Sequence, residues 1–191
     1  MITRLATAVL LVLAVAACGQ QASGPGSAPA PAPAAGAGAG TGGFGVTERA
    51  FVELSIATGE QAVRLLDLGF QRAAGAPLRA LAHDVAADRQ AELAELRGLL
   101  DTERIAYANH HAGHDMPGMP TGAELETLAA SGNGFDAVFV RLLRAHLEES
   151  TTVVRSALGS VTHEATRAVA NRMEQGRAVA LHRLAEVAGT G

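Results

Sequence analysis

The second half of this chain repeats the pattern of its first half, and this duplication constrains the fold more than any other feature. Residues match at a constant offset of 88 positions, as in Phe51 and Phe139 (139 − 51 = 88). Matched Phe, Glu and Arg residues are harder to obtain by chance than matched alanines in an alanine-rich sequence. The matches are Phe51/Phe139, Val52/Val140, Leu54/Leu142, Ala57/Ala145, Glu60/Glu148, Arg79/Arg167, Ala80/Ala168, Ala82/Ala170, Arg89/Arg177, Leu93/Leu181 and Leu96/Leu184.

Each copy has the apolar periodicity of two helices. In the first copy, apolar residues recur at steps of three and four from Thr47 onward and form a stripe along one helix face, which ends at the helix-breaking residues Gly75 and Pro77. A second apolar stripe of the same kind runs from Pro77 to Leu100. The second copy predicts helices over about 135–158 and 162–187. Because one helical hairpin cannot bury its stripe alone, we expect an all-α fold, a four-helix bundle made of two repeated hairpins.

A connection without helical periodicity separates the two copies. Thr121 and Glu124 form a capping-box pattern, which predicts a short extra helix in this connection. The boundaries expected are 47–188 for the bundle, with repeat one at 47–106, a His/Met loop and short helix at 107–133, and repeat two at 134–188.

The N-terminus has the features of a targeting segment. "LATAVLLVLAVAA" is too short to span a membrane as a stable helix and ends in small residues. "VAAC", which ends at Cys18, resembles the lipobox of bacterial lipoproteins and implies a lipoprotein signal peptide over 1–17 with a lipid on Cys18; a plain secretory signal is the alternative. The Ala/Pro/Gly-rich residues 18–46 predict a disordered tether. We therefore expect an extracytoplasmic protein anchored to the membrane of the bacterial cell envelope.

The connection gathers side chains that can bind metal ions. "NHHAGHDMPGM", residues 109–119, holds three of the chain's seven histidines and two of its four methionines. Imidazole suits Cu(II) and Zn(II), and thioether selects Cu(I). A pliable segment could close these donors around one ion; the alternative is a polar linker with solvated histidines. The candidate ligands are His110, His111, His114, Met116 and Met119.

The stretch "MPGMPTGAELETLAASGNGFDAVFVRLLRAH" resembles the domain of unknown function 305 family, which includes CopM-type copper-binding proteins of the bacterial envelope. The resemblance extends from Thr47 to about Val187 and implies a ferritin-like four-helix bundle. It also implies metal ligands, because each repeat in that family carries a His-His pair beside methionines on its first helix.

The chain departs from the family at the implied ligands, of which His146 is the one histidine retained. Thr58, Gly59 and Leu147 replace the other three histidines, and Ser55 and Leu143 replace the methionines. The resemblance therefore extends the candidate metal ligands to His146 alone. A hydrogen-bonded core histidine is the alternative interpretation of this residue.

The repeated charges suggest a second hypothesis. Arg89 and Arg177 occupy positions on apolar stripes, and Glu60 and Glu148 follow the sites of the histidine pairs. Charges that face a core need partners. We expect these glutamates and arginines to pair in the bundle; alternatively, the arginine side chains extend along their stems to water.

Several function classes are disfavoured. A net charge of −4 without a basic patch argues against nucleic acid. Neither a Glu-x-x-His pair nor a zinc-protease, hydrolase or phosphate-loop motif occurs, so we do not expect an enzyme. The leading hypothesis is an envelope lipoprotein that binds or buffers a transition metal, with copper as the first choice and zinc as the second. The alternative is a metal-free helical scaffold or protein-interaction module.

Overall fold

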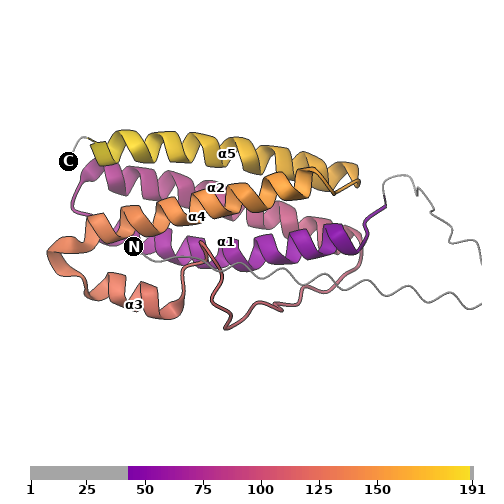
Figure 1. The fold of residues 1–191 in the computed structure, drawn as a ribbon, viewed down its shortest axis with the longest axis horizontal. Coiled ribbons are helices and arrows are strands. Elements are labelled where there is room, and N and C mark those ends of the chain that lie inside the picture. The colour runs from indigo at the N-terminus through magenta and orange to yellow at the C-terminus, as the bar shows by residue number, and fades with distance from the viewer. Residues whose placement is uncertain (1–42, 190–191) are drawn as a thin grey trace, which may run out of the picture. The chain divides into compact units, whose positions relative to one another are not determined.

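Four long helices run through residues 43–189, the part of the chain that the computed structural model describes (Figure 1). They are α1 (Val46–Arg72), α2 (Ala76–Thr102), α4 (Phe135–Leu158) and α5 (Glu164–Gly189). A short helix α3 (Gly122–Ala130) and a single 3-10 turn (Gly132–Gly134) precede α4. No strand occurs in these residues, so the prediction of an all-α bundle is confirmed. The predicted signal peptide, Cys18 and most of the predicted tether lie outside the described residues.

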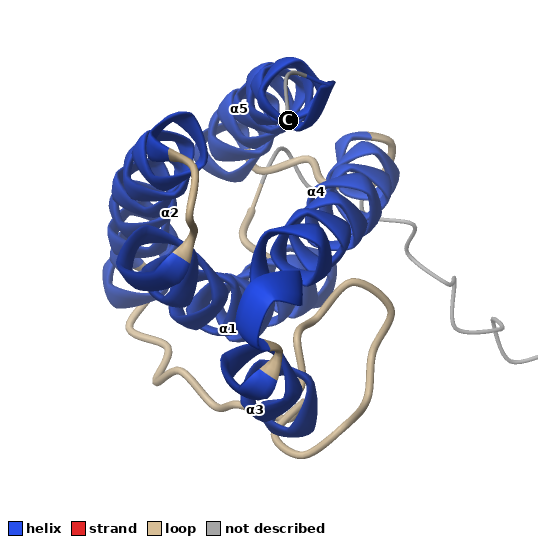
Figure 2. Ribbon diagram, turned by 90° about the vertical axis from the view of Figure 1, so that its left-hand side faces the viewer, coloured by secondary structure: helices blue, strands red, loops and turns tan. Residues whose placement is uncertain are grey.

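The helices pack as two antiparallel hairpins side by side. Helix α1 packs against α2 and α4 packs against α5, while α1–α4 and α2–α5 contacts join the hairpins. Figure 2 shows the four helices around a common centre, with α3 outside the bundle near α1 and α4. None of the described helices is long and apolar enough to cross a membrane.

A carboxylate from each hairpin caps the turn of the other hairpin. Asp136 on α4 accepts hydrogen bonds from the backbone N–H groups of Ala74 (2.9 Å) and Gly75 (3.3 Å) between α1 and α2. Glu48 on α1 accepts them from Thr162 (2.8 Å) and His163 (3.3 Å) between α4 and α5. Donors and acceptors are all related by the repeat offset (136 − 48 = 88; 162 − 74 = 88; 163 − 75 = 88). The duplication seen in the sequence is thus repeated in these cross-hairpin bonds.

The bundle core contains two apolar clusters separated by a polar layer. One cluster includes Leu65, Leu81, Phe139 and Leu184, and the other includes Phe51, Ile56, Leu96, Val154 and Met173. Along α2 the first cluster ends at Ala86 and the second begins at Leu93, with the buried Arg89 between them. On α5, Arg177 is buried between Met173 and Ala180 in the same way. We call Arg89, Glu92, His146, Ser150 and Arg177 the polar layer.

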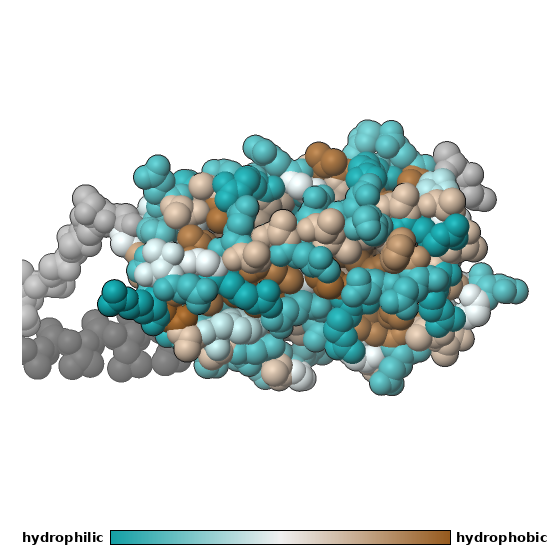
Figure 3. Space-filling view, turned by 180° about the vertical axis from the view of Figure 1, so that it is seen from behind, coloured by the Kyte–Doolittle hydropathy of each residue, from teal (hydrophilic) through white to brown (hydrophobic). Residues whose placement is uncertain are grey.

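The face of the bundle opposite to that of Figure 1 carries many hydrophilic side chains. On the face seen in Figure 3, hydrophilic side chains are spread over the helices with smaller apolar areas between them. Ion pairs join α5 to α2 at the surface, between Arg172 and Glu95 (2.5 Å) and between Arg183 and Asp84 (2.7 Å). Exposed pairs of this kind contribute little stability, so the core carries most of it.

Candidate metal centre

The His/Met loop forms two consecutive tight turns. The His114 N–H donates to the His111 carbonyl (3.1 Å), and the Met119 N–H donates to the Met116 carbonyl (3.0 Å). The third residue of each turn is a glycine with positive φ, Gly113 (76°) and Gly118 (68°). Proline second and glycine third is the pattern of a type II turn, which explains why "MPGM" folds as it does.

These turns place the five predicted loop donors at more than one position on the protein, so they do not all meet at a single site. His110 and His114 are exposed and His111 is half-buried, and their imidazoles make no hydrogen bond to other described residues. Met119 is buried, at 8% exposure. His111, His114 and Met119 line a surface hollow of about 200 Å³ with Asn109 and Asp115. Within residues 43–189, no three His, Cys, Asp or Glu side chains converge as a metal site.

The second turn fastens the loop to α4 through Gly118. A Cβ atom at Gly118 would lie 2.8 Å from the Ala145 carbonyl oxygen, so only glycine allows the turn to approach α4 this closely. The Gly118 carbonyl oxygen accepts a hydrogen bond from Nδ1 of His146 (3.1 Å). Because a carbonyl can only accept, the proton of the neutral ring is on Nδ1 and the lone pair is on Nε2.

His146 is a buried, neutral imidazole with one free nitrogen. Burial, together with the positive charges of Arg89 and Arg177, lowers the pKa of His146 to about 3, against the opposing effect of the Gly118 hydrogen bond and Glu92. The side chain is 2% exposed, and Nε2 has no hydrogen-bond partner among the described residues. A ring held through Nδ1 by a backbone carbonyl, with Nε2 free, is the usual arrangement of a metal-binding histidine.

Two methionines line a small cavity with His146. This cavity, of about 40 Å³, lies between the Met116–Gly118 turn, α1, α4 and α5. Met116 comes from the loop and Met173 from α5. The space suits a single water or ion. Sequence reasoning missed Met173, which the apolar stripe of α5 marks only as a core residue.

The predicted partners of the buried arginines are wrong. Glu60 pairs with Arg97 (2.7 Å) instead, and Glu148 is exposed. The alternative, arginines that reach water, is also wrong, because Arg89 is 2% and Arg177 is 3% exposed. Both arginines bind the one carboxylate that reaches the polar layer, Glu92, which lies one helical turn beyond Arg89 on α2.

The Arg89–Glu92–Arg177 triad is closely hydrogen-bonded. Nη1 of Arg89 lies 2.9 Å from Oε2 of Glu92, and Arg177 binds both oxygens of Glu92, at 2.7 and 2.9 Å. Nε of Arg177 also donates to Ser150 Oγ (3.1 Å). Nε of Arg89 is buried without a partner among the described residues. With two guanidiniums and one carboxylate, the triad has a net charge of +1 beside His146.

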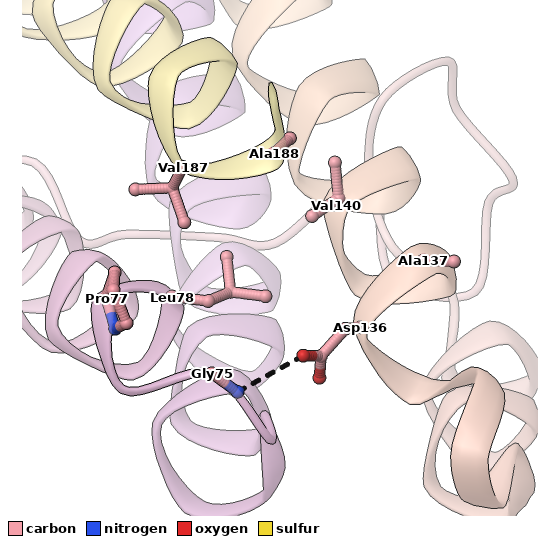
Figure 4. A pocket seen from close by; sticks show the side chains of 8 residues that line it. All are labelled: Gly75, Pro77, Leu78, Asp136, Ala137, Val140, Val187 and Ala188. Atoms are coloured by element: carbon pink, nitrogen blue, oxygen red, sulfur yellow. Dashed lines mark hydrogen bonds between the residues drawn. The ribbon is translucent and has the colours of Figure 1, made fainter. Parts of the chain in front are cut away.

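A larger pocket at the end of the bundle offers no comparable donors. It encloses about 410 Å³ and is lined mainly by apolar side chains such as Leu78, Val140 and Val187 (Figure 4). Its one carboxylate, Asp136, already accepts backbone N–H groups, including that of Gly75 drawn in Figure 4. The cavity at His146 is therefore the stronger candidate for a metal.

Comparison with known proteins gives both a family and a fold match. A family model described as "Domain of unknown function (DUF305)" matches residues 48–188. No curated protein matches the chain. The crystal structure of a DUF305 fragment from Deinococcus radiodurans is similar, with a TM-score of 0.69 and 17% sequence identity over 77% of this chain and 98% of that fragment. At this identity the structural match supports the fold alone. The family match covers most of the chain, and the chain therefore belongs to the DUF305 family.

Proposed function

We propose that this protein is an envelope lipoprotein that binds or buffers copper, and that His146, Met116 and Met173 form its principal site for Cu(I). The observation that carries this proposal is a buried, neutral His146 with an unpartnered Nε2, which lines one small cavity together with Met116 and Met173. Soft thioether donors select Cu(I), and imidazole completes a low-coordinate site. No proton has to leave His146 at neutral pH, since burial keeps its pKa near 3.

The loop histidines are placed to receive an ion from solution. His111, His114 and Met119 share a surface hollow, and the next turn of the same loop brings Met116 to the cavity at His146. An ion held by exposed imidazoles would need only a local movement of the Met116–Met119 turn to reach the cavity. In this scheme the loop captures copper and the cavity retains it.

Replacing the two thioethers tests the principal site. Met116→Leu together with Met173→Leu keeps the volume and apolar character of the core while it removes both sulfurs. We expect affinity for Ag(I), a Cu(I) mimic stable in air, to fall by about tenfold or more in calorimetric titrations of the mature chain. Met119→Leu is the matched control, because Met119 is buried but does not line this cavity. Wild-type affinity in the double variant would refute the site.

A loop variant separates capture from retention. With His110, His111 and His114 all changed to Ala, we expect Ag(I) to bind with near wild-type affinity but more slowly in stopped-flow measurements. Complete loss of binding in this variant would move the principal site to the loop.

The envelope location is part of the same proposal and depends on Cys18. We expect the wild-type chain to incorporate labelled palmitate in a bacterial host and to fractionate with membranes. The Cys18→Ala variant is expected to lose the label and appear in the soluble extracytoplasmic fraction. Labelling of the variant equal to that of the wild type would contradict lipidation at this residue.

A metal-free scaffold is the second candidate function. Two observations favour it: the loop donors do not converge among the described residues, and the Arg89–Glu92–Arg177 triad beside His146 has a net positive charge. This reading predicts that the wild-type chain binds none of Ag(I), Cu(I), Cu(II) and Zn(II), so the titrations above decide between the two functions.

A further inference from the structure

We propose that the Arg89–Glu92–Arg177 triad is a charge filter that restricts the cavity at His146 to monovalent ions and excludes Cu(II) and Zn(II). This inference rests on the proposed function, because it concerns the selectivity of the same site. It assigns a role to the net charge of the triad, in which two repeat-equivalent arginines share a carboxylate that has no acidic repeat equivalent.

The triad is coupled to the cavity through Arg177, which belongs to both. Arg177 lines the cavity together with His146 and Met173. Its guanidinium is fixed by hydrogen bonds to Glu92, to Ser150 Oγ (3.1 Å) and to the Met173 carbonyl (3.0 Å). Because every nitrogen of this guanidinium has a partner, Arg177 cannot turn away from an incoming ion without breaking several bonds.

The charge balance around the cavity determines which ions are tolerated. The proposed ligands, one imidazole and two thioethers, are all neutral and leave the charge of the ion uncompensated. The triad adds a fixed charge of +1 in a buried region, where Coulomb interactions are poorly screened. Two further carboxylates are near: Glu149 lines the cavity, and Asp88 on α2 interacts electrostatically with Arg89. Both residues are exposed, so water screens their charges. Repulsion scales with the charge of the ion, so a divalent ion is repelled twice as strongly as a monovalent one.

The duplication explains why both arginines are present, but it does not explain why only one carboxylate accompanies them. The repeat equivalent of Glu92 is Ala180 (92 + 88 = 180), so two equivalent arginines share a single carboxylate. Stability gives no general reason for it either, since replacing a buried ion cluster with apolar side chains of similar volume is often neutral or stabilising. Arg89 even leaves a buried Nε unpaired. A function for the charge itself accounts for the surplus arginine.

Changing Arg89 isolates the charge. Arg89→Met fills a similar volume and leaves Glu92 paired with both nitrogens of Arg177, which makes the polar layer neutral. Arg89→Gln removes the same charge but keeps a hydrogen-bond donor, and it serves as a second variant if the first does not fold. Arg172→Met is the matched control, since it removes an exposed arginine paired with Glu95. All chains carry the three His→Ala changes in the loop, so that the loop imidazoles do not contribute, and the remaining exposed histidines are common to every chain compared.

Calorimetric titration with Ag(I) and with Zn(II) measures the affinity of each chain for a monovalent and a divalent ion. In the simple Coulomb picture, the gain in Zn(II) affinity on neutralising the layer is the square of the gain in Ag(I) affinity. We expect gains of about tenfold for Ag(I) and about a hundredfold for Zn(II) with either Arg89 variant, and none with Arg172→Met. If the parent chain binds Ag(I) but the Arg89 variants gain equally for both ions or not at all, the filter is refuted and the site stands. If no chain binds Ag(I), both the site and the filter are refuted.

Discussion

His146 has one satisfied and one unsatisfied ring nitrogen, and its burial makes the stability of the fold depend on pH. The pKa of His146 is lowered by burial from 6.5 to about 3, so the folded protein holds the ring neutral where the unfolded chain protonates it. A group with a depressed basic pKa favours the unfolded state as pH falls below its unfolded value.

We therefore expect the free energy of unfolding to decrease as pH falls from 6.5 towards 3, by up to about 1.4 kcal/mol per pH unit. His146→Gln is expected to remove this slope, and His83→Gln, at an exposed histidine, to keep it. Urea denaturation between pH 7 and 5 measures both. A wild-type slope in His146→Gln would show that another group titrates.

Two glycines in the loop have similar φ angles but different surroundings, so the same substitution can be compared at both. Gly113 and Gly118 both have positive φ, but a Cβ at Gly113 would meet nothing within 4 Å, whereas one at Gly118 would meet Glu149 and the backbone of α4. We expect Gly113→Ala to cost about 1 kcal/mol, from backbone strain alone, and Gly118→Ala to cost clearly more. Equal losses of unfolding free energy would mean that the turn does not pack on α4 as described.

At the scale of single helices, apolar periodicity, helix-breaking residues and capping patterns were sufficient to predict where the helices lie in the sequence. The apolar stripe and Gly75-Ala-Pro77 placed the first hairpin turn, and the Thr121/Glu124 pattern placed α3, whose capping box is formed (Glu124 N–H to Thr121 Oγ1, 3.2 Å). Such signals are local, since each depends on residues three or four positions apart. The direction of the loop side chains was not predictable in this way, because it depends on how Gly118 docks against α4.

The two carboxylate caps join elements that are distant in the sequence, and Glu48 predicts a measurable acid sensitivity. Burial raises the pKa of Glu48, but backbone N–H donors from Thr162, Gly45 and His163 outweigh it and lower the pKa from 4.5 to about 2. A depressed acidic pKa stabilises the fold above the unfolded value, and this stability is lost as pH falls from about 4.5 to 2.

Glu48→Gln is thus expected to lower the free energy of unfolding by about 1–3 kcal/mol at pH 7. The difference from wild type is expected to shrink as pH falls from about 4.5 towards 2, because Glu48 is protonated first in the unfolded chain and in the folded protein only near pH 2. Thermal unfolding monitored by circular dichroism over this range is the measurement. Glu148→Gln makes the same change at an exposed glutamate and is a suitable control. A difference that stays constant with pH would contradict the charged cap.

At the scale of the whole molecule, the candidate site lies where the two repeats differ. The two carboxylate caps and the two buried arginines occur at equivalent positions of both repeats. The repeat equivalent of His146 is Thr58 (146 − 58 = 88), which lines the same cavity, and Glu92 has no acidic equivalent. Sequence comparison of the halves therefore predicted the bundle and the burial-prone arginines. The comparison could not predict that Arg177 binds Glu92, because these residues are 85 positions apart and belong to different hairpins. It also could not predict that Met173 and His146 line the same cavity.

The polar layer offers a last prediction, because it separates two apolar clusters that would otherwise be continuous. Removing only the shared carboxylate, by Glu92→Gln, leaves two buried guanidiniums facing each other and is expected to cost about 3–5 kcal/mol. Replacing the triad together, by Arg89→Met, Glu92→Leu and Arg177→Met, joins the clusters without an unpaired charge and is expected to preserve or increase the free energy of unfolding in urea. A triple variant much less stable than wild type would mean that the bundle needs the triad to fold. In that case stability, rather than ion selection, would explain why a duplicated helical hairpin has charges at its centre.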